Sequence, residues 1–144
     1  MCTLSWHIDD TGYALFFNRD ERHSRSAAHP PDFRFGGGID ILAPLDPDGG
    51  GTWIAVNARG VSTCLLNRYD VPGKPAPPSG FESRGRLVAA LAGACGWEGT
   101  RRTLEMMKLD RYPPFHLCQI APGSPMRFCS WDGSLPCFAE AEDC

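Results

Sequence analysis

The sequence lacks the features that mark a membrane or secreted protein. No apolar run approaches the roughly 20 residues that an α-helix needs to span a bilayer. The opening stretch, MCTLSWHIDD, has no basic region followed by a long apolar segment, so it is not typical of a secretory signal. We therefore expect a soluble, cytoplasmic protein without a membrane span.

An excess of positive charge is also missing. Lys and Arg together number 14, Asp and Glu number 17, and the formal net charge is −3. Non-specific nucleic-acid binding depends on surplus Lys and Arg, so we expect no nucleic-acid partner. The glycine-rich stretches FGGGID and DGGGTW lack the G-x-x-x-x-G-K-[ST] pattern and a following helix, which argues against a phosphate-binding loop.

The seven cysteines are not arranged as metal ligands. The chain has no Cys-x-x-Cys pair and no histidine at zinc-finger spacing from a cysteine pair, so no metal site is predicted. An odd cysteine count without a secretory signal argues against a disulfide framework. Cys64, Cys95 and Cys118 lie in apolar runs, which favours buried side chains that act as small apolar groups.

The length and the order of elements predict one α+β domain. A chain of 144 residues is typical of a single domain, here residues 1–144. Alternating apolar residues and turn signals predict strands at 3–8, 13–18, 52–57, 61–67, 114–122 and 126–133. Helical spacing predicts helices at 83–95, capped by Ser83 and stopped by Gly96, and at 98–109. Strands before and after a helical block indicate antiparallel sheets.

Two segments receive more specific predictions. Residues 13–18 are apolar on both faces and are expected to be buried on both. Residues 22–51 are rich in Arg, His, Pro, Asp and Gly, which predicts a long irregular excursion of the kind that is usually functional or mobile.

Cys2, directly behind the initiator methionine, is a candidate nucleophile. Its small side chain permits removal of Met1, which would leave a thiol and a free α-amino group on one residue. The amine has a pKa near ~7.7–8.0 and the thiol near ~8.5, so proton transfer between them is nearly thermoneutral. A terminal nucleophile with its own amine as base is an established catalytic unit. The alternative is a cysteine at this position without a role.

The stretch Asn18–Glu21 gives that candidate a setting. If strands 3–8 and 13–18 pair as a hairpin, the end of the second strand returns beside Cys2. A carboxylate there can hold the α-ammonium group, and a guanidinium favours the thiolate and can bind an anion. The alternative is a solvated turn whose charges pair with one another.

Several motifs in order carry a resemblance to a known family. MCTL, NRDE, GGTW, NARGVSTCLLNRY and SRGRLV follow one another with matching spacing. The chain from Met1 to about Gly133 resembles the NRDE family, also called the transport and Golgi organisation protein 2 family. The resemblance implies an α/β/β/α sandwich similar to that of N-terminal nucleophile hydrolases. Members generally run longer, which implies that the chain is a fragment, the N-terminal part of a longer family domain, or a divergent short form with an incomplete sandwich, or that a partner chain completes the sandwich.

The resemblance also implies a site. Choloylglycine hydrolases and penicillin V acylases likewise begin with Met-Cys and transfer acyl groups through the cysteine. By this resemblance the catalytic residues would be Cys2, Asp20 and Asn67, with Asn67 in the oxyanion hole. A correctly aimed amide there lowers the barrier by ~2.7–4 kcal/mol. The expected contacts to a small-molecule substrate are Asn18, Arg19, Glu21 and Trp53, with no cofactor.

Two other functions stay open. One is binding and trafficking of haem, a lipid or acyl-CoA without hydrolysis, because such roles have been proposed in the family. The candidate haem ligands are the four histidines, His7, His23, His29 and His116. Trp53, or Phe33 with Phe35, would then line an apolar wall. The other is a hydrolase fold that has lost its chemistry. Self-association of the chain is left open in each case.

Overall fold

The computed structural model describes residues 2–36, 38–71, 75–77 and 79–141. Within these residues the chain forms nine strands, two α-helices and one short 3-10 helix. The strands are β1 (Thr3–Asp9), β2 (Gly12–Asn18), β3 (His29–Gly36), β4 (Ile39–Leu45), β5 (Ile54–Asn57), β6 (Ser62–Asn67), β7 (Phe115–Ile120), β8 (Arg127–Trp131) and β9 (Pro136–Glu140). The helices are α1 (Gly85–Leu91), α2 (Trp97–Met106) and η1 (Leu109–Arg111).

The first two strands form the predicted hairpin as a separate two-stranded sheet. Their register pairs Thr3 with Asn18 at the open end and Asp9 with Gly12 at the turn. The Asp9 carboxylate closes the turn by accepting from the Thr11 and Gly12 backbone N–H groups at 2.8 and 3.1 Å. The expectation that 13–18 is buried on both faces is wrong, because Phe16 is 65% exposed. The strand instead alternates between an inner and an outer face.

The other seven strands form one antiparallel sheet in chain order, β3 to β9. Both β3 and β4 lie inside residues 22–51, so the prediction of an irregular excursion there is wrong. The signal was hidden because β3 is an edge strand with two prolines, which an edge tolerates, and with an exposed Phe33. The strand β9, at the opposite edge, was also not predicted.

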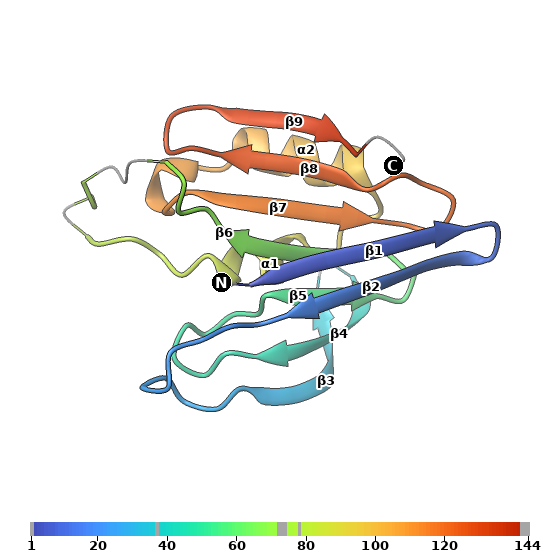
Figure 1. Ribbon diagram of the computed structural model, residues 1–144, viewed down its shortest axis with the longest axis horizontal. Coiled ribbons are helices and arrows are strands. Elements are labelled where there is room, and N and C mark those ends of the chain that lie inside the picture. The colour runs from blue at the N-terminus through green and yellow to red at the C-terminus, as the bar shows by residue number, and fades with distance from the viewer. Residues whose placement is uncertain (1, 37, 72–74, 78, 142–144) are drawn as a thin grey trace.

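The helices and the hairpin cover opposite faces of the large sheet. Figure 1 shows β1 and β2 crossing in front of the sheet, with α1 and α2 behind it. The helical side holds the larger core, in which Leu87, Val88 and Leu104 of the helices pack against Leu65 and Leu117 of the sheet. The predicted α+β class with antiparallel sheets is thus confirmed. The described residues form three layers, and the four-layer sandwich stays a prediction.

The helices differ from the predicted ones at their ends. Ser83 is not the N-cap residue, because α1 starts after Arg84, whose side chain makes no capping hydrogen bond. The helix ends at Leu91, so Cys95 falls outside it and is exposed, against expectation. Cys64 and Cys118 are buried as predicted.

The helices in the described part of the chain are too short and too polar to cross a lipid bilayer.

Candidate functional site

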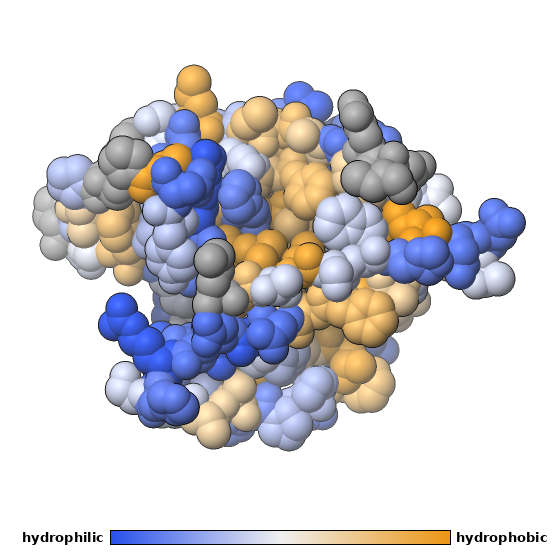
Figure 2. Space-filling model, viewed as in Figure 1, coloured by the Kyte–Doolittle hydropathy of each residue, from blue (hydrophilic) through white to orange (hydrophobic). Residues whose placement is uncertain are grey.

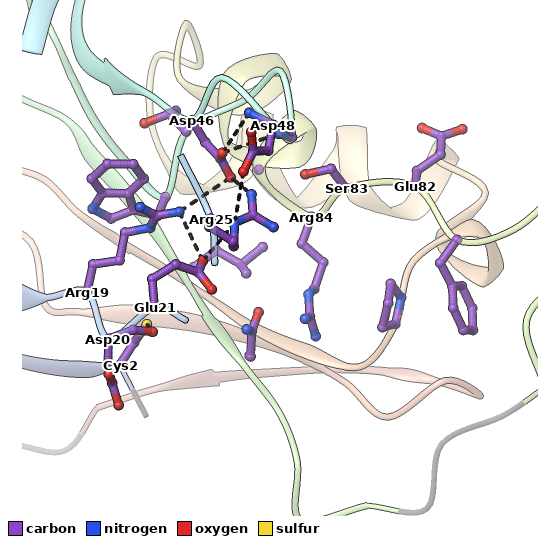
Figure 3. Close-up of a pocket in the computed structure, with 18 residues that line it drawn as sticks. Cys2, Arg19, Asp20, Glu21, Arg25, Asp46, Asp48, Glu82, Ser83 and Arg84 are labelled. Carbon is purple, nitrogen blue, oxygen red and sulfur yellow. Dashed lines mark hydrogen bonds and ion pairs between the residues drawn. The ribbon is translucent and has the colours of Figure 1, made fainter. Parts of the chain in front are cut away.

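A pocket of about 410 Å³ opens where the hairpin, the end of the large sheet and the segment before α1 meet (Figure 3). The open end of the hairpin contributes Cys2 and residues 19–21. The strand β6 contributes Leu65 and Asn67, the segment before β5 contributes residues 52–53, and residues 81–85 close the opposite side. Pockets of this size hold small organic ligands.

Cys2 lies beside the NRDE stretch, as the hairpin register requires. Thr3 pairs with Asn18, and the Cys2 Sγ lies 3.8 Å from the Asp20 backbone oxygen. The pKa of the Asp20 carboxyl is lowered, chiefly by hydrogen bonding and attraction to the positively charged amino terminus of the chain, with a smaller contribution from His23. Cys2 and Asp20 therefore both line the pocket (Figure 3).

Six of the seven predicted site residues line this pocket. They are Cys2, Arg19, Asp20, Glu21, Trp53 and Asn67. Asn18 is not among the lining residues: it ends β2, is exposed and pairs with Thr3 through the backbone. The pocket thus gathers residues that are up to 111 positions apart in the chain, from Cys2 to Pro113 (113 − 2).

One wall of the pocket is an ion-pair network that involves Arg19. Its guanidinium lies 3.0 Å from the Glu21 carboxylate and 3.5 Å from Asp46, and it stacks over the Trp53 ring at 4.3 Å from the centroid. Arg25 joins the network at 2.5 Å from Asp46 and 3.3 Å from Glu21. Arg19 and Glu21 therefore neutralise each other within the wall (Figure 3).

The network sets the ionisation of its members. Burial opposes ionisation of Asp46, but hydrogen bonds from Arg25 and from the Gly49 N–H outweigh it, and the pKa of this carboxyl is lowered. The hydrogen bond to Asp46 raises the pKa of Arg25. Ser26, which donates its backbone N–H at 3.0 Å, lowers the pKa of Asp48. Arg25, Asp46 and Asp48 are thus charged near neutral pH.

The glycines of the GGTW motif permit close backbone packing beside the pocket. A Cβ on Gly51 would lie 2.3 Å from the Gly85 carbonyl carbon, and a Cβ on Gly85 would lie 3.0 Å from the Thr52 backbone. The Thr52 N–H donates to the Gly85 oxygen at 3.1 Å. This approach binds the start of α1 to the sheet next to Trp53, and only glycine fits at Gly51.

Asn67 ends β6 with its side chain at the pocket. Its Nδ2 donates to the Tyr69 hydroxyl at 2.7 Å. A side-chain amide carries two N–H donors, so this contact uses one of them. The Asn67 amide, which is the candidate oxyanion-hole donor, is therefore oriented by its hydrogen bond to the Tyr69 hydroxyl.

The order of these pieces along the chain matches a known family. The sequence model of the family described as Transport and Golgi organisation 2 matches residues 1–131 of the 144. The chain belongs to the transport and Golgi organisation 2 family. The resemblance noted from its motifs is confirmed. No curated protein matches the chain.

In this member of the transport and Golgi organisation 2 family, two further groups line the pocket that the sequence did not single out. Asp46 and Asp48 belong to the DPDGGG stretch, whose turn composition was the available signal. Arg84 belongs to the SRGRLV motif, but nothing in a linear motif indicates which side chain faces a pocket. Both findings depend on contacts between distant segments.

Proposed function

We propose that the protein is an N-terminal-cysteine hydrolase that cleaves small amides through an acyl-enzyme on Cys2. The observation that carries this proposal is the register of the hairpin. Because Thr3 lies opposite Asn18, the first thiol of the chain lies at the pocket beside Asp20. Removal of Met1 would place the α-amino group on the same residue.

The reaction divides into two balanced steps. The Cys2 thiol proton passes to the α-amino group as the sulfur–carbon bond forms. That proton then leaves on the amine product when the carbon–nitrogen bond breaks, which gives a thioester. Water cleaves the thioester, releases the carboxylic acid and restores the thiol. Asp20 orients the α-ammonium group, and the second N–H of Asn67 stabilises the oxyanion.

The first test compares cysteines within one protein. Intact mass measures whether Met1 is removed, and limited alkylation with iodoacetamide ranks the thiols by rate. Cys95 and Cys137 are exposed and serve as internal controls. We expect Cys2, which is only partly exposed, to react faster than both. Retention of Met1, or alkylation of Cys2 no faster than the controls, would falsify the proposal.

A second test addresses Asp20. Asp20→Asn removes the carboxylate beside Cys2, whereas Asp10→Asn changes an exposed carboxyl at the far end of the hairpin. We expect the first variant to slow acylation of Cys2 by a p-nitroanilide amide, followed as p-nitroaniline release, at least tenfold. The second variant should match the wild-type rate. Equal rates in all three proteins would remove Asp20 from the mechanism.

Binding of haem, a lipid or acyl-CoA stays a prediction, and no observation favours it. None of the four candidate histidines is among the described residues that line the pocket. His7, His23 and His29 are exposed, and the ring of His116 lies 2.6 Å from the Ser130 hydroxyl oxygen. A haem titration with a Soret band that one His variant abolishes would support this second function.

A further inference from the structure

Three arginines line the pocket, and they differ in how their charge is balanced. Arg19 and Arg25 lie within 4.0 Å of carboxylates in the network wall. For Arg84, the described residues provide no carboxylate within ion-pair distance. Its Nη1 donates to the Pro114 backbone oxygen at 2.8 Å, which leaves a guanidinium without a counter-charge.

The acidic residues of the pocket are engaged elsewhere. Glu21, Asp46 and Asp48 belong to the network with Arg19 and Arg25. Glu82 is ion-paired with Arg111 and accepts from the Tyr112 hydroxyl at 3.1 Å. Asp20 interacts with the amino terminus. The excess of acids over bases in the lining therefore does not neutralise Arg84.

Arg84 is aimed at the reactive side of the pocket. Figure 3 shows its side chain descending from the segment before α1, whereas the carboxylate of Glu82 points away from it. Electrostatic interactions link it to Cys2 and to the Tyr69 hydroxyl, the same hydroxyl that holds the Asn67 amide. Arg84 thus lies near both groups to which the proposed mechanism assigns chemistry.

Burial makes the lone charge costly. Desolvation lowers the pKa of the Arg84 guanidinium, and its interactions with Tyr69 and Cys2 only partly offset this effect. A half-buried arginine that has no carboxylate partner is suited to bind an anion, because its planar N–H pairs match a carboxylate or phosphate in a bidentate manner. The backbone contact between Gly85 and Thr52 holds the adjacent residue in place.

We propose that Arg84 binds a carboxylate of the substrate and restricts the enzyme to small, negatively charged N-acyl amides. This inference rests on the proposed function of Cys2 and names its substrate class. The pocket contains an apolar lining from Trp53, Leu65, Phe81 and Pro113 that accepts a hydrocarbon side chain. An N-acylated apolar amino acid combines the required amide, apolar group and carboxylate.

The test measures binding without chemistry. The full chain carrying Cys2→Ala is titrated calorimetrically with N-acetyl-L-leucine and with N-acetyl-L-leucinamide, which has nearly the same size but no charge. Charge-assisted hydrogen bonds to arginine favour the carboxylate by about tenfold or more in dissociation constant. Adding Arg84→Gln should abolish this preference, and Arg84→Lys should retain part of it.

Arg86→Gln is the matched control, because Arg86 is exposed two positions away and does not line the pocket. It should keep the full preference for the carboxylate. Equal binding of the two probes, no binding of either, or a preference that survives Arg84→Gln would overturn the assignment of Arg84. Each of these results leaves the alkylation rate of Cys2 in the wild-type chain unaffected, so failure of this inference is distinguishable from failure of the proposed function.

Discussion

The two faces of the seven-stranded sheet are covered in different ways. Among the described residues, the helical face has a cluster of fifteen buried apolar side chains, whereas the hairpin face has four, joined by nine that are only partly buried. Figure 2 views the molecule from the hairpin side and shows hydrophobic surface over its middle and hydrophilic surface near the open end of the hairpin. The buried apolar contacts that stabilise the fold are thus concentrated on the helical face of the sheet. Cys2 lies on the hairpin face, which has fewer of these contacts.

This difference determines how firmly the two sides of the pocket are supported by buried contacts. The pocket forms where the two covers meet, with Cys2 on the hairpin and Arg84 before α1. A nucleophile on a partly buried hairpin depends on a few contacts for its position, while the group opposite it is backed by a dense core. Regions with fewer buried apolar contacts open locally at lower free energy. Substitutions on the two faces should therefore have separable effects.

The largest expected effect is on the free energy of unfolding, and it compares one leucine on each face of the sheet. Leu87 is 0% exposed on the helical face, and Leu15 is partly buried under the hairpin. Leu87→Ala should lower the free energy of unfolding by about 2–5 kcal/mol, because it opens a cavity in a dense core. Leu15→Ala should cost less than half as much. Urea denaturation measures both, and equal losses would contradict the difference between the faces.

The second prediction concerns the close backbone contact between Gly51 and Gly85, where the start of α1 meets the sheet side. Gly51→Ala forces a Cβ against the Gly85 backbone, which has no flexible side chain to move aside, so we expect a loss of about 3 kcal/mol. Gly99→Ala is the control, since its Cβ meets nothing within 4 Å inside α2. That change should stabilise the protein by about 0.5–1 kcal/mol. Thermal unfolding of both variants separates steric conflict from the general effect of replacing glycine.

The same contrast explains what the sequence could reveal about the fold. The alternation of Leu4, Trp6 and Ile8, followed by a turn, predicts the hairpin because each signal is local. Edge strands such as β3 are harder to predict from the sequence, since one side of the strand lacks a partner and exposed residues such as Phe33 disturb the alternation of apolar and polar residues. Propensity also fails at α1, which begins after Arg84 rather than at a Ser83 cap and whose Gly85 oxygen accepts from the Thr52 N–H of the sheet side.

The candidate site was predictable to the extent that it depends on the hairpin. Pairing of β1 with β2 is enough to place Cys2 beside Asp20, and the motif order added Asn67 and Trp53. The role of Arg84 was not predictable, because the absence of a carboxylate partner is a property of the folded surroundings. The neutralised state of Arg19 was hidden for the same reason, since Asp46 lies 27 positions further along the chain (46 − 19).

A third prediction concerns the charged wall that joins the hairpin exit to the sheet. Asp46→Asn removes the carboxylate that lies nearest to Arg25 and should cost about 1.5–2 kcal/mol at pH 7. Because the folded pKa of Asp46 is lowered, its contribution is fully present above the unfolded pKa of about 3.9 and is lost as pH falls through the folded value.

Urea denaturation of wild type and Asp46→Asn at pH 7, 5 and 3 measures this contribution. The stability gap should be constant from pH 7 to 5 and narrower at pH 3. Asp10→Asn, which alters an exposed carboxyl away from the network, should show little difference from wild type at any of the three pH values. A gap for Asp46→Asn that widened toward pH 3 would contradict the assigned charge state.

The smallest expected change is the most specific to the hairpin. The Tyr13 hydroxyl lies 2.5 Å from the Gly60 oxygen, to which it donates, and 2.8 Å from the Ser62 hydroxyl, anchoring β2 to the sheet. Tyr13→Phe should cost about 1 kcal/mol, as should Tyr112→Phe, which removes a hydrogen bond to Glu82 on the helical side. Only the first should speed hydrogen exchange in β1 and β2, because it loosens the hairpin while the helical core stays packed. Exchange that rose equally in the hairpin and the helices would mean that both layers open together. The position of Cys2 would then depend on the whole fold rather than on the hairpin alone.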